Sequence, residues 1–363
     1  MRRILLLITD LKIGGTPTVV RELATRINRW PDVHVHVACL SEWGPVADQI
    51  RAAGVDVTAL GARSMRDIGT IRQLSRLIRQ QQIDTVFSFL VHANAAAAIS
   101  SWTNRRVRYF QAIQTTQPRP RWHWWVQGLI AGAARRIVVP SESVARAAQT
   151  RAGIDRQKIV IIPNAVDVHE FEGLSPGAHA RATRPPPFPI GFIGRLDPIK
   201  RVGDLLQAIA PLRNQLHLHV FGDGADRRKI EALIAQLYLR DAVTMHGQVP
   251  RPQDALSQIR LLVLPSEAEG FPMVLIEAMA AGVPIVATGA PGIRDVLTHE
   301  RTGLLVPVGD ARALSEAIRH AVEDEPLRRA LAQSAHDDVQ QKYSWEKVIE
   351  QYRQLLIPPA SIR

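Results

Sequence analysis

The sequence predicts an α/β protein with two doubly wound parallel-sheet domains. Its 363 residues suit two domains of ordinary size. Short apolar runs typical of buried parallel strands alternate with helical patterns, and this alternation occurs twice. A stretch rich in glycine and proline, residues 173–189, separates the two series and reads as a linker. We therefore expect domains at 1–172 and 190–340, and a terminal helical segment at 341–363.

The composition narrows the class of protein. Hydrophobic residues make up 46% of the chain, which is enough for substantial cores. Cys39 is the only cysteine, so an internal disulfide and a multi-cysteine metal site are excluded, and a reducing compartment is indicated. The apolar run at 4–8 is short and is followed by Asp10 and Lys12, which predicts a first strand rather than a signal peptide. With no apolar run of about 18 residues, we expect a cytoplasmic protein.

The net charge of +11 is unevenly distributed. Residues 1–186 contain 25 Lys and Arg against 13 Asp and Glu, whereas the remainder contains 20 against 21. The basic half should prefer an anionic partner, such as a phospholipid surface, a lipid-linked phosphate or nucleic acid. The alternative is an ordinary solvated face. No nucleic-acid-binding motif accompanies the charge, so nucleic acid is disfavoured.

The first domain offers three candidate site residues, each after a predicted strand. Gly15 belongs to a Gly-Gly pair after the strand at 4–9, where glycine permits positive φ and close approach of a phosphate; a plain turn is the alternative. No G-x-G-x-x-G is present, which disfavours a dinucleotide site. His92 and Gln114 follow the strands at 84–90 and 107–113 and can reach hydroxyl groups at the sheet edge, although His92 can equally be structural.

Residues 118–136 form an unusual stretch. Three of the seven tryptophans and several arginines fall there, ahead of and within a predicted helix. Tryptophan suits the headgroup depth of a membrane and arginine suits lipid phosphate. Two alternatives remain open: packing of the tryptophans inside the domain, and stacking on RNA bases.

In the second domain a cationic pair follows the first strand. Arg195 and Lys200 lie between the strand at 190–193 and the helix expected at 202–210. Both side chains and the helix N-terminus can converge on one phosphate group. Alternatively, they are two unrelated surface cations. Gly222 and Gly224 follow the next strand and are further candidates for binding the same ligand.

Two glutamates surround the start of a later helix. The apolar run 261–265 predicts a buried strand, Pro272 suits the first helical position, and Gly282 marks the end of the helix. Glu269 is therefore expected in the loop, and Glu277 inside an apolar helix, where a charge needs a partner. Carboxylates at this edge suit hydrogen bonds from sugar or ribose hydroxyls. The alternative is that both are solvated acids.

This E-x7-E stretch resembles that of the retaining GT-B glycosyltransferases of family 4, also called glycosyltransferase group 1. Gly194–Lys200 resembles the family's "G-R-L-x-x-x-K", and 302–306 resembles its "x-G-L-L-V". The resemblance covers nearly the full length and is more specific in the second half. Gln114 stands where many relatives have histidine, and Ala165 where they have glycine; neither departure falls among the expected donor residues.

The resemblance implies the GT-B fold, with two Rossmann-like domains facing a central cleft and a C-terminal helix crossing back to the first domain. It implies that Arg195 and Lys200 neutralise the donor diphosphate, that Glu269 acts on the transferred sugar and that Glu277 binds ribose. The remaining donor contacts are expected from Gly15, Gly222, Gly224 and the backbone N–H groups of Phe271, Met273 and Val274, with His92 and Gln114 on the acceptor side. We expect no metal, because no D-x-D motif is present, and no other cofactor.

The expected function is retaining transfer of a sugar, from a UDP- or GDP-linked donor, to a glycan or lipid-linked acceptor in cell-envelope polysaccharide, lipopolysaccharide or glycolipid synthesis. The protein would lie in the cytoplasm, with peripheral contact to an anionic membrane through 118–136. The alternatives are a GT-B sugar-nucleotide epimerase or phosphorylase, or a non-catalytic protein that binds membrane or nucleic acid.

Overall fold

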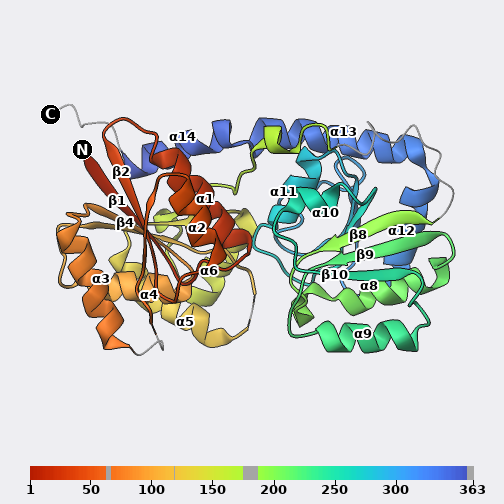
Figure 1. Cartoon of the computed structure of the whole chain (residues 1–363), viewed down its shortest axis with the longest axis horizontal. Helices are drawn as coiled ribbons and strands as arrows, with labels where there is room; N and C mark the ends of the chain where they lie inside the picture. The colour runs from red at the N-terminus through yellow and green to blue at the C-terminus, as the bar shows by residue number, and fades with distance from the viewer. Residues whose placement is uncertain (63–66, 118, 175–186, 358–363) are drawn as a thin grey trace. The chain divides into compact units, whose positions relative to one another are not determined.

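The computed structural model describes residues 1–62, 67–117, 119–174 and 187–357 (Figure 1). The chain forms two compact units. The first consists of Met1–Asn164 and the segment from Glu346 onward, and the second of Ala165–Trp345. The change of unit at Asn164 precedes the expected linker 173–189, of which residues 175–186 lie outside the described residues.

The first unit contains a seven-stranded parallel sheet. Its strand order is β3-β2-β1-β4-β5-β6-β7, so the order reverses beside the central strand β1. This is the doubly wound arrangement that the alternating pattern predicted. The strands are β1 (Arg2–Ile8), β2 (Val33–Cys39), β3 (Asp56–Ala59), β4 (Thr85–Phe89), β5 (Arg108–Ala112), β6 (Arg136–Val139) and β7 (Ile159–Ile161).

Helices cover both faces of this sheet. Because right-handed crossovers that run in opposite directions place their helices on opposite faces, α1 and α2 form one layer, and α3 to α6 form the other (Figure 1). Leu5 and Leu7 of β1 are buried against Leu74 of α3 and Ala93 of α4. The helices are α1 (Gly15–Ile27), α2 (Pro45–Ala52), α3 (Ile68–Gln80), α4 (Val91–Ser101), α5 (Arg121–Ile130) and α6 (Glu142–Ala152), with 3-10 turns at Ala131–Ala133 and Arg156–Lys158.

The C-terminal helix α14 (Trp345–Leu356) packs on the first unit. Tyr352 is fully buried, and its ring lies 6.1 Å from that of Phe87 in β4. Val348 and Leu356 are also fully buried. The helix therefore contributes to the core of a unit whose other elements all precede residue 165.

The second unit contains a six-stranded parallel sheet in the order β10-β9-β8-β11-β12-β13. The strands are β8 (Phe188–Ile193), β9 (Leu216–Phe221), β10 (Val243–Gly247), β11 (Leu262–Leu264), β12 (Ile285–Thr288) and β13 (Leu304–Val306). The helices are α8 (Val202–Ile209), α9 (Arg227–Gln236), α10 (Pro252–Leu256), α11 (Met273–Ala280), α12 (Ala311–Glu323) and α13 (Glu325–Lys342), with 3-10 turns at Val168–Phe171, Pro198–Lys200 and Ala210–Leu212. The fold class predicted from the sequence is confirmed. In the described part of the chain, none of the helices combines the length and the apolar character of a membrane-spanning segment.

Three histidines gather at strands β9 and β10. His219 Nδ1 lies 2.9 Å from His246 Nε2, and His217 Nε2 lies 2.8 Å from the hydroxyl of Thr244. His246 also stacks on Phe221 at 4.3 Å between ring centroids. Burial, and then the neighbouring His217 and His246, lower the pKa of His219 to about 4. The neutral rings therefore fit this folded arrangement better than charged ones do.

We expect removal of Tyr352 to destabilise the protein strongly. Tyr352→Ala leaves a cavity between α14 and β4, and comparable aromatic truncations cost about 3–5 kcal/mol. Gln351→Ala, at an exposed position on the same helix, is the matched control and should leave the thermal unfolding temperature nearly unchanged. Equal unfolding temperatures for the two variants would contradict this account of α14.

We also expect His219 to make stability depend on pH. Its pKa is lower in the folded state than the ordinary 6.5, so the unfolded chain binds the proton more readily and stability falls as pH drops from 6.5 toward 4. His219→Asn should flatten this part of the curve in chemical denaturation. His320→Asn, at an exposed histidine of α12, should not; a curve for His219→Asn parallel to the wild type would contradict the prediction.

Candidate functional site

The candidate site lies at the carboxyl edge of the second sheet. Because all the strands are parallel, the loops after β8, β9, β10, β11 and β12 emerge at the same edge, which is where open α/β sheets bind ligands. Most of the predicted donor residues fall in these loops. The fold therefore brings most of these candidates to one edge, and their role in binding a donor stays a prediction.

Lys200 and Glu269 form an ion pair across two of these loops. Lys200 Nζ lies 2.5 Å from Glu269 Oε1, and the two side chains are only 16% and 11% exposed. The pair joins the 3-10 turn after β8 to the loop after β11. In a partly buried position each charge compensates the other, and removal of one leaves the other unpaired.

The backbone fixes the loop that carries Glu269. Glu267 N–H donates to the carbonyl of Ile199 at 2.8 Å, and Glu269 N–H donates to the carbonyl of Pro291 at 3.2 Å. Gly292 has φ +81°, and a Cβ there would lie 2.3 Å from the carbonyl oxygen of Glu269. The loops after β8, β11 and β12 are thus held together around the ion pair.

Arg195 and Lys200 have different carboxylate partners and differ in exposure. The side chain of Arg195 is 68% exposed, and its guanidinium lies 3.1 Å from Asp197 Oδ2. Lys200, by contrast, points to Glu269. Between Lys200 and α8, Arg201 pairs with Asp204 and Glu267. The segment therefore presents one accessible guanidinium and one partly buried ammonium group.

Gly222 and Gly224 have a structural reason to be glycine. A Cβ on Gly222 would lie 1.9 Å from the carbonyl oxygen of Gly194, and one on Gly224 would lie 2.6 Å from that of Leu196. The loops after β8 and β9 therefore pack backbone against backbone. Donor binding by these glycines stays a prediction, but their close approach does not depend on it.

Helix α11 starts at the same edge. Pro272 is its N-cap, without a capping side chain, and no acidic residue lies in its first turn. The N–H groups of Met273 and Val274 are thus at the positive end of the helix dipole. Phe271 is buried, and its ring packs edge-on against Tyr343 at 5.3 Å. As expected, the rest of the helix is largely buried, with Glu277 half-buried within it.

In the first unit, His92 belongs to an aromatic cluster. His92 lies in the first turn of α4, and Trp122 and His123 lie in the first turn of α5. The His92 ring stacks on Trp122 at 5.7 Å and meets His123 edge-on at 5.9 Å. Burial, and then the neighbouring His123, lower the pKa of His92. An exposed indole can stack on a sugar ring. A neutral imidazole beside it can form hydrogen bonds with the hydroxyl groups of that sugar.

The sequence analysis did not predict that Trp122 and His123 lie beside His92. The topology gives the signal: α4 and α5 follow the adjacent parallel strands β4 and β5, so their first turns must be neighbours at one edge. Gln114, after β5, is half-buried at this edge as well.

The Gly-Gly pair does not use the positive φ that glycine permits. Gly14 has φ 170°, which is extended backbone, and Gly15 is the first residue of α1. A Cβ on Gly14 would make only an ordinary contact, 3.7 Å from Pro17. The pair therefore leaves two successive positions at the start of α1 without side chains.

Two further features bear on ligands. Among the described residues, no group of three or more His, Cys, Asp or Glu side chains is placed to hold a metal ion.

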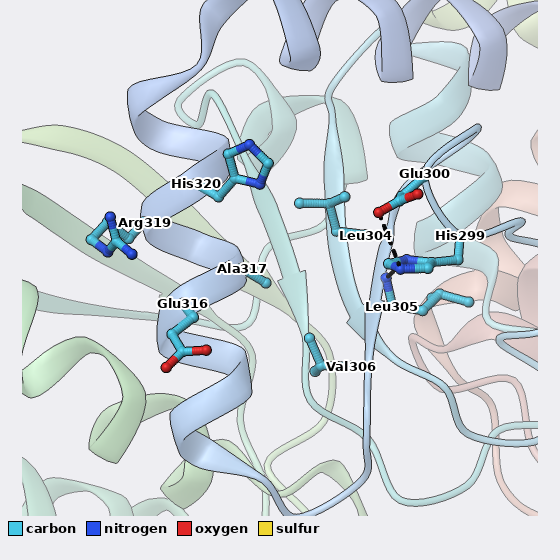
Figure 2. Close-up of a pocket in the computed structure, with 9 residues that line it drawn as sticks. All are labelled: His299, Glu300, Leu304, Leu305, Val306, Glu316, Ala317, Arg319 and His320. Carbon is cyan, nitrogen blue, oxygen red and sulfur yellow. Dashed lines mark hydrogen bonds and ion pairs between the residues drawn. The ribbon is translucent and has the colours of Figure 1, made fainter.

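A pocket of about 310 Å³ lies beside β13 and α12, and none of the predicted site residues lines it (Figure 2). There His299 Nδ1 accepts a hydrogen bond from Leu305 N–H at 3.0 Å, so the ring covers part of the sheet edge.

Comparison with curated proteins gives partial matches. Over 156 residues the chain is 35% identical to N-acetyl-alpha-D-glucosaminyl L-malate synthase of Bacillus anthracis, covering 42% of this chain and 41% of that protein. Over 240 residues it is 31% identical to D-inositol 3-phosphate glycosyltransferase of Corynebacterium urealyticum, covering 59% and 56%. The match thus spans less than two thirds of each relative.

Solved structures match over the whole chain. Anabaena HepE, in complex with UDP and glucose, superposes with a TM-score of 0.87 at 20% identity, covering 98% of this chain and 99% of that one. Sucrose-phosphate synthase from Thermosynechococcus elongatus gives 0.80 at 22% identity, covering 98% of each chain. At these identities the likeness establishes the fold.

Two family models divide the sequence between them. Residues 13–170 match the model described as Glycosyltransferase Family 4, and residues 180–338 match that of Glycosyl transferases group 1. Together they span both units. The chain therefore belongs to the group 1, family 4 glycosyltransferases and has their GT-B fold.

Proposed function

We propose that this glycosyltransferase is a retaining enzyme that uses a nucleotide-sugar donor linked to UDP or GDP. The single observation that carries the proposal is the partly buried Lys200–Glu269 pair, which lies at the same sheet edge as the exposed Arg195 and the N-terminus of α11. Cations and helix N–H groups suit the diphosphate of a donor, and carboxylates suit its hydroxyls. The HepE structure, solved with UDP and glucose, supports the same ligand class.

The chemistry requires stabilisation of the departing nucleoside diphosphate. In the proposed mechanism Arg195 and Lys200 neutralise the charge that develops on the leaving oxygens, and N–H groups of Phe271, Met273 and Val274 assist. Glu269 accepts hydrogen bonds from hydroxyls of the transferred sugar, and Glu277 from the donor ribose. No residue serves as a covalent nucleophile; the leaving phosphate takes the acceptor's proton on the face it departs from.

Donor binding changes the state of the ion pair in this proposal. Without donor, Lys200 and Glu269 neutralise each other. With donor, the phosphate becomes a partner of Lys200 and sugar hydroxyls become partners of Glu269. Neither charge is then left buried without a partner, which would cost several kcal/mol.

The acceptor is proposed to be a glycan or a lipid-linked molecule in cell-envelope polysaccharide, lipopolysaccharide or glycolipid synthesis. Relatives include a lipopolysaccharide core biosynthesis glycosyltransferase of Rhizobium meliloti, 30% identical over 164 residues. In the first unit, the cluster of His92, Trp122 and His123 offers an aromatic surface for a sugar ring, and Gln114 lies at the same edge.

We expect one nucleotide to raise the melting temperature of the wild type and to do so less in Glu277→Ala. Ligand at about 100 times its dissociation constant stabilises the folded state by roughly 2.7 kcal/mol. The measurement is the change in melting temperature on addition of UDP, GDP, a UDP-linked sugar or a GDP-linked sugar. Glu267→Ala, at an exposed glutamate on the adjacent loop, is the control and should keep the full shift. The absence of any shift in the wild type would refute the donor proposal.

We expect Lys200→Met and Glu269→Gln to differ in what they lose. Lys200→Met should weaken nucleotide binding and lower transfer, because a phosphate partner is missing; Glu269→Gln should keep nucleotide binding but lower kcat by about 10²-fold or more. Arg201→Gln removes a neighbouring cation and is the control for Lys200→Met; it should keep nucleotide binding and transfer. Transfer is measured with and without acceptor, since an epimerase would convert the donor alone, and NMR of the product reports whether the anomeric configuration is retained.

A further inference from the structure

One face of the first unit exposes large apolar side chains on two adjacent helices. On α4, Ile99 is 45% exposed, and Trp102, which caps the helix, is 75% exposed. On α5, Trp122, Trp125 and Leu129 are 43%, 67% and 64% exposed. The two helices pack against each other in the same layer (Figure 1). We call these five residues the tryptophan face.

The spacing makes each set a single stripe. Ile99 and Trp102 are three residues apart, and Trp122, Trp125 and Leu129 follow at i, i+3 and i+7, so each set lies on one side of its helix. Single exposed apolar residues are normal, but contiguous ones mark sites of interaction. The face therefore requires an explanation outside the core.

Other residues of α5 already fill the core side of this helix. Trp124 is buried, its Nε1–H donates to the carbonyl of Gln117 at 2.8 Å, and Arg151 lies over its ring. Gln127, also buried, meets Asn94 of α4 at 3.4 Å. Of the three tryptophans in 118–136, only Trp124 packs inside the unit, and Trp102 joins the exposed face from outside that stretch.

The part of the chain that carries the tryptophan face is rich in arginine. From residue 68 to residue 141 the sequence contains ten arginines and one acidic residue, Asp84. Asp84 is itself engaged by the backbone N–H of Arg3 and by Arg108. The exposed arginines on α3, after α4, at the start of α5 and at the start of β6 are Arg72, Arg76, Arg79, Arg105, Arg106, Arg119, Arg121, Arg135 and Arg136.

We propose that the tryptophan face rests on an anionic phospholipid bilayer. Indole rings sit at headgroup depth, and guanidinium groups pair with lipid phosphates; the strength of interfacial binding is the sum of the two contributions. A second copy fits less well, because a two-fold interface would bring two arginine-rich surfaces together. This inference goes beyond the proposed donor chemistry and stands or fails independently of it.

The tryptophan face also leads to the candidate acceptor residues of the first unit. Trp122 is the end of the α5 stripe nearest the carboxyl edge of the sheet, and there it stacks on His92. A lipid-linked acceptor held in the bilayer would thus meet His92 and His123 at the membrane boundary. This second step rests on the proposed function, whereas bilayer binding does not.

The test is co-sedimentation of the full chain with vesicles of phosphatidylcholine alone and with added phosphatidylglycerol, at low and high salt. We expect binding only to the anionic vesicles and weakening by salt. Trp102→Ser with Trp125→Ser, and separately Arg105→Glu with Arg106→Glu, should each weaken the partition at least about tenfold. Each variant should keep the wild-type thermal unfolding temperature, which shows that it is folded.

Matched controls come from the second unit. Tyr238→Ser removes an aromatic side chain that is 86% exposed, and Arg312→Glu with Arg319→Glu makes the same charge change at two exposed arginines of α12. Both should bind like the wild type. A loss in the Arg312/Arg319 control equal to that of Arg105/Arg106 would show that net charge alone drives binding and would overturn the proposal, as would absence of vesicle binding by the wild type. So would a dimer, seen by analytical ultracentrifugation, that the tryptophan substitutions dissociate.

Discussion

Parallel pairing is the constraint on which both units depend. Parallel neighbours cannot be joined by a tight turn, so every connection crosses over the sheet as a longer segment, usually with a helix. The crossovers bury the strands on both faces and bring the loops that precede the helices to one edge. The Lys200–Glu269 pair in one unit and the contact of His92 with Trp122 in the other are products of this same rule.

The ion pair adds an energetic element to that edge. Lys200 and Glu269 come from loops that are 69 residues apart in the chain, and the side chains are mostly shielded from water. A pair of this kind contributes little net stability against apolar replacements, but it makes each charge dependent on a partner. Such a site favours a ligand that offers an anionic group and hydroxyl donors together.

Apolar runs and helix-ending signals were sufficient to predict the fold class, the strands and the sheet edge at which the candidate residues lie. They were not sufficient for side-chain direction. Arg195 and Lys200 are five positions apart, yet one is exposed and the other is not, because the 3-10 turn between β8 and α8 decides where each points. Likewise, a Gly-Gly pair permits positive φ without requiring it, and Gly14 is extended.

Helix α14 has a consequence for how the protein is made. Residues 346 onward complete the first unit, yet they leave the ribosome only after the whole second unit has been synthesised. Until then the surface of β4 around Phe87 lacks Tyr352 and leaves apolar groups in contact with water. Because domains tend to fold as units during synthesis, the first unit can complete its core only after the rest of the chain has been made.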